Sequence, residues 1–107
     1  MTKDELLNRV YEYLLVETEN NSDLNILNLA LEKIGDLICK NDEVIEKRLT
    51  YEPKTNATYI YFTGKKTIKV MGSTVIRNKK KNGPVFILDQ DKNGELVGLE
   101  VLFVKNE

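Results

Sequence analysis

The stretch that decides the fold is VFILDQDKNGELVGLEVLFV, residues 85–104. Its two ends, 85–88 and 96–104, are rich in β-branched and aromatic residues, which is typical of strands. Between them, residues 89–95 read DQDKNGE, a composition typical of tight turns. A type I turn over Asp91–Gly94, with Gly94 in the left-handed conformation, would give a three-residue loop with a G1 bulge. The stretch therefore predicts an antiparallel hairpin.

The same letters also match the calcium loop of an EF-hand. Asp89, Asp91, Asn93 and Gly94 stand at loop positions one, three, five and six, and Glu100 stands at position twelve. An EF-hand needs a helix on each side, whereas both flanks here favour strands. In a strand, Glu100 would lie on the order of 20 Å beyond the turn, too far to share a calcium ion with the first carboxylates. We therefore predict no metal site, and weak cation binding by the exposed carboxylates stays open.

Working outward, the preceding half of the chain contains further strand-like stretches. They are VIEKRLTY (44–51), ATYIYF (57–62), KTIKVM (66–71) and, after a turn at Gly72-Ser73, residues 74–77. The links between them are short, so neighbouring strands should be antiparallel. We expect five or six strands in all.

The first forty residues have helical periodicity instead. Thr2 and Glu5 have capping-box spacing, and apolar side chains then recur at helical intervals until about Glu17. A second helix should begin after a cap at Asn21 or Ser22. Its apolar positions cover an arc of roughly 140°; they are Leu24, Leu27, Ala30, Leu31, Ile34, Leu37 and Ile38.

These elements predict an α+β fold, with an N-terminal helical hairpin packed on one face of a five- to six-stranded antiparallel sheet. A chain of 107 residues is one domain by its size. We expect a single domain over 1–107, with the helical hairpin in 1–42 and the sheet in 43–107. The expected core residues are Leu6, Val10, Leu14, Leu27, Leu31, Ile34, Ile60, Phe62, Ile68, Ile87, Leu99 and Val101.

Two segments of the sheet half fit a known pattern. LTYEPKTNATYIYF (49–62) fits Y-D-P-x-x-D-A-x-Y-I through Tyr51, Pro53, Ala57, Tyr59 and Ile60. FILDQDKNGELVGLEVL (86–102) fits V-x-L-D-x-D-x-x-G-x-x-V-G-I-E-I-L; the matching residues are Leu88, Asp89, Asp91, Gly94, Val97, Gly98, Leu99, Glu100 and Leu102. Over roughly residues 48–104 the chain thus resembles the domain of unknown function 2283 family of small bacterial and phage domains.

The resemblance implies a compact antiparallel sheet. It implies no catalytic residues, because the family has no established activity. The chain departs from the pattern at Glu52 and Asn56, where the family has Asp, and its match at Leu99 is to a similar residue, because the family has Ile there. The basic stretch RNKKKNGP (77–84) and the two predicted helices lie outside the pattern.

Composition and charge narrow the class of protein. With 41% apolar and 31% charged residues, the chain reads as soluble and globular. No apolar run approaches the roughly 20 residues of a membrane helix, and MTKDELLNRV carries acids where a signal peptide would carry bases. The lone Cys39 allows no disulfide within the chain. We therefore expect a cytoplasmic protein without a membrane partner.

The net charge of −1 hides an uneven distribution. Residues 1–42 hold nine acids against four bases, whereas residues 53–88 hold eight bases and no acid. Such a split indicates either an electrostatic partner or two halves of one domain that attract each other.

The sequence offers little for catalysis. It contains no His, the commonest general base. Cys39 falls at the C-terminal end of a predicted helix, whereas a reactive thiolate favours an N-terminal end. Ser73 is expected in a turn, and Asp89 and Asp91 are expected at a hairpin tip, where water would solvate both carboxylates. We predict no enzyme activity, no catalytic residue and no cofactor.

Three functions remain, and the first is favoured. The chain could be a non-catalytic protein-interaction or regulatory module that binds another protein or itself as a homodimer. It could bind nucleic acid through the basic 53–88 segment, where aromatic rings could stack on bases; the candidate residues are Lys65, Lys66, Lys69, Arg77, Lys79, Lys80, Lys81, Tyr59 and Tyr61. It could also be a small phage-type inhibitor of a host protein.

Overall fold

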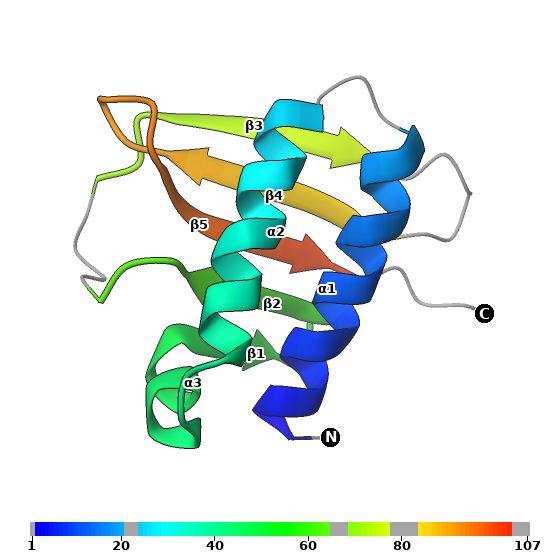
Figure 1. The fold of residues 1–107 in the computed structure, drawn as a ribbon, viewed down its shortest axis with the longest axis vertical. Coiled ribbons are helices and arrows are strands. Elements are labelled where there is room, and N and C mark those ends of the chain that lie inside the picture. The colour runs from blue at the N-terminus through cyan, green and yellow to red at the C-terminus, as the bar shows by residue number, and fades with distance from the viewer. Residues whose placement is uncertain (1, 21–23, 65–68, 78–83, 104–107) are drawn as a thin grey trace. The chain divides into compact units, whose positions relative to one another are not determined.

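The computed structural model describes residues 2–20, 24–64, 69–77 and 84–103. Its contacts divide the chain into two compact units, Met1–Lys47 and Arg48–Glu107. The first unit is helical and the second contains the sheet (Figure 1), so the predicted α+β class is confirmed. That both units form one domain, with the helices against the sheet, stays a prediction.

The two predicted helices are α1 (Lys3–Asn20) and α2 (Leu24–Ile38). The predicted cap of α1 is confirmed, because Thr2 Oγ1 accepts a hydrogen bond from the backbone N–H of Glu5 at 3.1 Å. The predicted caps of α2, Asn21 and Ser22, lie outside the described residues. In the part of the chain that the structure describes, no helix is long and apolar enough to cross a membrane.

The buried face of α2 follows the predicted stripe except at its two ends, where Leu24 is exposed and Ile38 is half-buried. Its buried side chains are Leu27, Ala30, Leu31, Ile34 and Leu37. Gly35 lies beside α1, since a Cβ there would stand 3.8 Å from Cε2 of Tyr11. That distance is an ordinary van der Waals contact, so an alanine would fit between α2 and α1 at this position.

The strand predicted over 44–51 is wrong for most of its length. Residues Asp42–Arg48 form a third helix, α3, and only Leu49–Glu52 are extended, as β1. Asn41 caps α3, with its Oδ1 accepting from the N–H of Val44 at 3.0 Å, and Glu43 pairs with Lys47 one turn later at 3.5 Å. The cap and the acids of the first turn outweigh an alternating pattern that is only a few residues long.

Within the described residues, the sheet has five antiparallel strands in the order β1-β2-β5-β4-β3 (Figure 1). The remaining strands are β2 (Ala57–Tyr61), β3 (Gly72–Arg77), β4 (Val85–Gln90) and β5 (Leu96–Leu102). Every neighbouring pair is antiparallel. Short connections account for this in the pairs of consecutive strands, whereas β2 and β5 pair although β3 and β4 separate them in sequence. β1 and β3 are therefore the two edge strands.

β3 begins earlier than predicted. Gly72 and Ser73, expected in a turn, are its first two residues and pair with Gln90 and Asp89 of β4. The strand predicted over 66–71 lies partly outside the described residues, and residues 69–71 are not in a strand. Most of the basic stretch 77–84 also falls outside them.

The hairpin of β4 and β5 has the predicted turn. Gly94 has a φ of 78°, and its N–H donates to the Asp91 carbonyl at 3.0 Å. The N–H of Asp91 donates to the Glu95 carbonyl at 3.0 Å, which closes the three-residue loop. Asp91 Oδ1 accepts from the N–H groups of Asn93 at 2.8 Å and Glu95 at 3.0 Å. The flanking segments are strands, so the EF-hand interpretation fails on geometry.

One face of the sheet is buried. Its buried apolar side chains are Leu49, Ile60, Ile76, Phe86, Leu88, Leu99 and Val101. The prediction that Ile87 belongs to the core is wrong, because Ile87 lies on the opposite face of the sheet and is half-buried. Leu6 and Phe62, which were also expected in the core, are half-buried too. The apolar run 85–88 does not alternate, so the sequence could not show which of its side chains point inward. Ile68 lies outside the described residues.

Candidate functional site

The second face of the sheet carries most of the polar chemistry of this unit. Residues directly opposite each other on antiparallel strands project on the same side. We call this side the tyrosine face; the register assigns to it Thr50, Glu52, Ala57, Tyr59, Tyr61, Ser73, Val75, Arg77, Val85, Ile87, Asp89, Gly98, Glu100 and Leu102. Its side chains are mostly half-buried or exposed, so they can meet a partner.

Three of these residues form a hydrogen-bonded chain across the strands. The Tyr59 hydroxyl donates to Asp89 Oδ2 at 2.8 Å, and the Ser73 hydroxyl donates to Asp89 Oδ1 at 2.6 Å. Burial, and then the hydrogen bond to Asp89, raises the pKa of Tyr59 well above its ordinary value. Tyr59 therefore stays a protonated donor at physiological pH, and each Asp89 oxygen has a partner.

Gly98 makes the hydrogen bond between Tyr59 and Asp89 possible. It lies on β5, between Tyr61 of β2 and Asp89 of β4. A Cβ at Gly98 would overlap the hydroxyl and ring of Tyr59, so only glycine lets the ring cross β5 to reach Asp89. The rings of Tyr59 and Tyr61 lie 4.7 Å apart, tilted by 58°, an arrangement that aromatic pairs favour.

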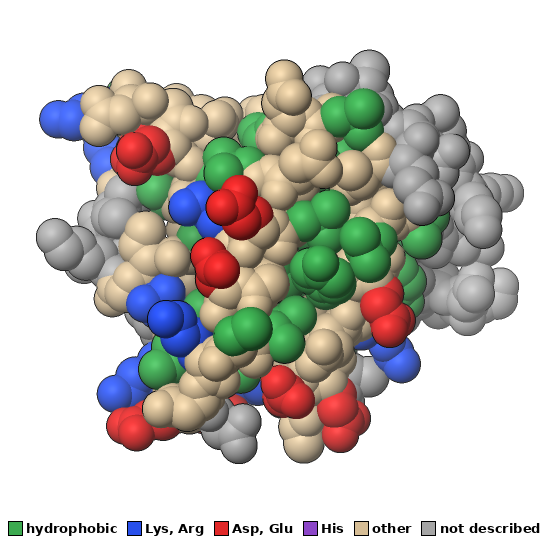
Figure 2. Space-filling model, viewed as in Figure 1, with side chains coloured by type: hydrophobic (Ala, Val, Ile, Leu, Met, Phe, Trp, Pro, Cys, Tyr) green, Lys and Arg blue, Asp and Glu red, His purple; other side chains and the backbone are tan. Residues whose placement is uncertain are grey.

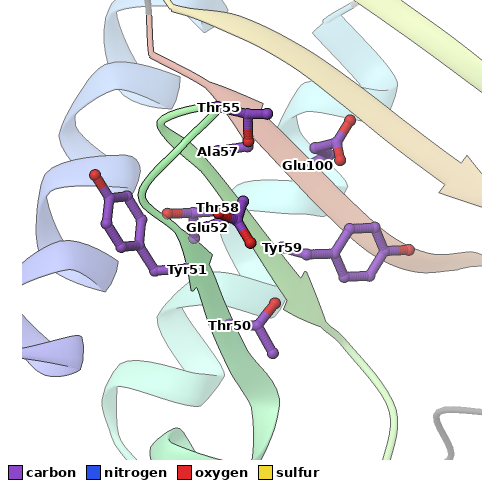
Figure 3. Close-up of a pocket in the computed structure, with 8 residues that line it drawn as sticks. All are labelled: Thr50, Tyr51, Glu52, Thr55, Ala57, Thr58, Tyr59 and Glu100. Carbon is purple, nitrogen blue, oxygen red and sulfur yellow. The ribbon is translucent and has the colours of Figure 1, made fainter.

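A pocket of about 330 Å³ opens beside Tyr59 (Figure 3). It is lined by Thr50, Tyr51, Glu52, Thr55, Ala57, Thr58, Tyr59 and Glu100. In Figure 3 the Tyr51 ring points away from Tyr59 and Glu100. Glu52 and Glu100 supply carboxylates to the lining, which favours hydrogen-bond donors or a positively charged group as a guest. The described residues contain no group of three or more His, Cys, Asp or Glu that could hold a metal ion.

The nine candidate nucleic-acid residues fall in different places. Lys65, Lys66, Lys79, Lys80 and Lys81 lie outside the described residues. Lys69 precedes β3 and Arg77 ends it, and both are exposed. The structure brings Tyr59 and Tyr61 together, and it directs the Tyr59 hydroxyl to the Asp89 carboxylate.

Sequence reasoning misplaced two residues of this site. Asp89 is not at the solvated hairpin tip but in β4, where it is half-buried, and Ser73 is in β3 rather than in a turn. Only Asp91 occupies the turn as expected. The signal that could have found Asp89 is its position directly after the apolar run 85–88, because a strand continuing by one residue puts its side chain on the face opposite Leu88.

The fold and this face define a small α+β protein whose five-stranded antiparallel sheet has one buried face and one polar face. The chain belongs to the DUF2283 family, described as a protein of unknown function, whose pattern matches residues 48–105. The match covers the sheet unit and leaves α1 and α2 outside it, as the resemblance in sequence indicated. No curated protein and no solved structure matches the chain.

Proposed function

We propose that this protein is a non-catalytic protein-interaction or regulatory module, and that its contact surface includes residues 70–77. The observation that carries the proposal is the exposure of large apolar side chains in this stretch. Val70 is 42% exposed, Met71 58% and Val75 50%. Exposed apolar side chains that gather in one place are typical of protein-binding surfaces.

The polar groups of the tyrosine face support a binding role over catalysis. The Asp89 carboxylate is engaged by Tyr59 and Ser73, and a raised pKa makes Tyr59 a poor general base or nucleophile. The sequence has no His to activate the Ser73 hydroxyl. We therefore assign Tyr59, Ser73 and Asp89 a structural role, in which their hydrogen bonds order this face of the sheet.

The helical unit offers a second apolar surface. Leu15, Val16, Leu24 and Leu29 are exposed large apolar residues of α1 and α2, and Figure 2 shows hydrophobic side chains gathered on the viewed face of the molecule. Unlike Val75, these residues are not on a sheet edge, where unpaired backbone groups could add hydrogen bonds to a partner. We therefore assign the primary contact to residues 70–77.

A comparative pull-down tests the proposal. The tagged full chain and its Val75→Lys variant are exposed to lysate of the native host, and captured proteins are compared by quantitative mass spectrometry. We expect at least one protein, or the untagged chain itself, to be captured by the wild type and lost with the variant. Equal capture by the two proteins would contradict the proposed surface. Cytoplasmic location is part of this proposal, and fractionation of host cells checks it.

Nucleic-acid binding is the second candidate, supported by charge. Residues 48–107 hold eleven Lys and Arg against six Asp and Glu, a formal net charge of +5. Basic surfaces of this kind bind phosphate backbones at low salt. Anisotropy titrations with single- and double-stranded DNA and RNA at about 50 mM salt test it; absence of binding to all four would eliminate it. In the phage-type inhibitor alternative, the pull-down would recover a host protein as the partner.

A further inference from the structure

We propose that a second copy of this chain docks along the outer edge of β3, antiparallel to it, so that two five-stranded sheets join into one ten-stranded sheet. This inference rests on the proposed function and names its partner. In the described part of the chain, no strand pairs with that edge. An edge strand presents unpaired backbone N–H and C=O groups, which another strand can satisfy.

The two edges of the sheet differ in how they are protected. β1 has four residues, contains Glu52 and is followed directly by Pro53. Shortness, charge and proline all discourage pairing at an edge. β3 has six residues, contains no proline, and carries its single charge at its last residue, Arg77. The β3 edge is therefore the one that can accept another strand.

The sequence of β3 is complementary to itself about Val75. In a two-fold arrangement that pairs Val75 with the second copy's Val75, the apolar side chains, each half exposed in one chain, cover each other. The same register places Thr74 opposite the second copy's Ile76. The tyrosine faces of the two copies then lie on the same side of the joined sheet.

Charge complementarity selects this register. Arg77 comes to lie opposite the second copy's Ser73, whose hydroxyl is 2.6 Å from Asp89 Oδ1. A guanidinium at that position can reach the Asp89 carboxylate, and by symmetry the pair forms twice. In the neighbouring two-fold register, Thr74 would pair with the second copy's Thr74. Arg77 would then lie opposite the second copy's Met71, and both contacts between Arg77 and Asp89 would be lost.

The interface is small, so the dimer should be weak and dependent on concentration. The sheet unit, which carries the β3 edge, has a formal net charge of +5, so repulsion between the two copies opposes association. Sedimentation of the full chain over a wide concentration range should show a reversible monomer–dimer equilibrium. Strictly monomeric behaviour at the highest concentration would overturn the inference.

Substitutions at the two edges separate β3 from other contacts. Val75→Lys should weaken association at least about tenfold, because it removes apolar burial and opposes two like charges. Thr50→Lys is the matched control, since Thr50 is an exposed residue of the same face on the other edge strand, and it should leave association unchanged. Circular dichroism confirms that each variant is folded. Loss of the dimer with Thr50→Lys but not with Val75→Lys would overturn the inference.

Cross-linking tests the register independently. In a Cys39→Ser background, Val75→Cys should give a disulfide-linked dimer on mild oxidation, because only a residue paired with itself brings two Cα atoms within disulfide range. Thr74→Cys should give none. Cross-linking at position 74 and not at 75 would overturn the proposed pairing.

The two proposals fail differently. If the chain sediments as a monomer but the pull-down captures a different protein through Val75, the interaction-module function stands and self-pairing falls. If neither a dimer nor a Val75-dependent partner is found, both fall.

Discussion

The ring of Tyr59 crosses β5 above Gly98, and its hydroxyl ends on the Asp89 carboxylate. The sequence contains all three residues, and all three lie within residues 48–105, which match the family. What it could not show is that they meet, because Tyr59 and Asp89 are 30 residues apart and their meeting depends on the exact register of three strands. A slip of one residue would send Tyr59 to the other face.

Gly98→Ala should lower the free energy of unfolding by about 1–3 kcal/mol, because a methyl group would displace the Tyr59 ring from its place over the strand. Urea denaturation measures the change. The same substitution in a Tyr59→Thr background should cost less, since the obstructing ring is then gone. Equal losses in both backgrounds would show that the ring is not the cause.

Thr58→Val should raise the free energy of unfolding by about 1 kcal/mol, because it replaces a buried hydroxyl with a methyl group of similar size. Thr58 is fully buried, and its Oγ1 has no hydrogen-bond partner among the described residues. Thr50→Val is the control at an exposed position, where little change is expected. A clear loss of stability in Thr58→Val would mean that the hydroxyl is satisfied in solution.

Stability should fall as the pH rises above about 10, the ordinary pKa of tyrosine. Because the folded-state pKa of Tyr59 is raised, the unfolded chain gives up that proton first, and the contribution of Tyr59 is lost with rising pH. In Tyr59→Phe the alkaline decline should be shallower, although the variant is less stable at neutral pH. Urea unfolding at several alkaline pH values compares the two proteins; parallel declines would contradict the assignment.

At the scale of elements, the hairpin of β4 and β5 was predictable and the start of the sheet was not. Gly94 suits the left-handed conformation of the turn, and Asp91 accepts hydrogen bonds from turn N–H groups, so local sequence was enough to predict the turn and the two strands that it joins. For residues 42–48, an Asn cap and a strand-like alternation competed, and the cap prevailed. Short segments with two consistent patterns are decided by context that a single sequence does not reveal.

Asp91→Ala should lower stability by roughly 1–2 kcal/mol, because it leaves the N–H groups of Asn93 and Glu95 without their side-chain acceptor. Asp91→Asn keeps an acceptor oxygen and should recover most of the loss. Thermal unfolding of the three proteins checks this order. A loss equal to that of Ala in the Asn variant would point to the charge of Asp91 rather than to its hydrogen bonds.

At the scale of the whole molecule, the α+β class, the two N-terminal helices and the terminal hairpin followed from periodicity and turn chemistry, whereas α3 did not. The candidate site did not, because it consists of contacts between β2, β3 and β4 that no local pattern encodes. The uneven distribution of charge seen in the sequence follows the two structural units, because the helical unit is acidic and the sheet unit is basic. Residues 1–47 hold eleven acids against five bases, a formal net charge of −6, opposite in sign to that of residues 48–107.

Calcium at about 1 mM should leave the melting temperature of the protein unchanged. A ligand raises the melting temperature only when its concentration is comparable with or above its Kd, and Glu100 lies in β5, opposite Tyr59, away from the turn. Calorimetric titration with calcium complements the melting experiment. A micromolar site would show that the loop binds the ion as its sequence suggests.

The contact from Tyr59 through Asp89 to Ser73 begins on β2 and ends on β3, and β5, between them, contributes only bare backbone at Gly98. A rim strand ordinarily frays by itself, since backbone bonds hold it on one side only. Here, fraying of β3 also removes the Ser73 hydroxyl from the Asp89 carboxylate, which accepts the hydrogen bond that holds the Tyr59 ring over β5. Loss of order in the edge strand β3 is therefore expected to loosen Tyr59, which lines the pocket.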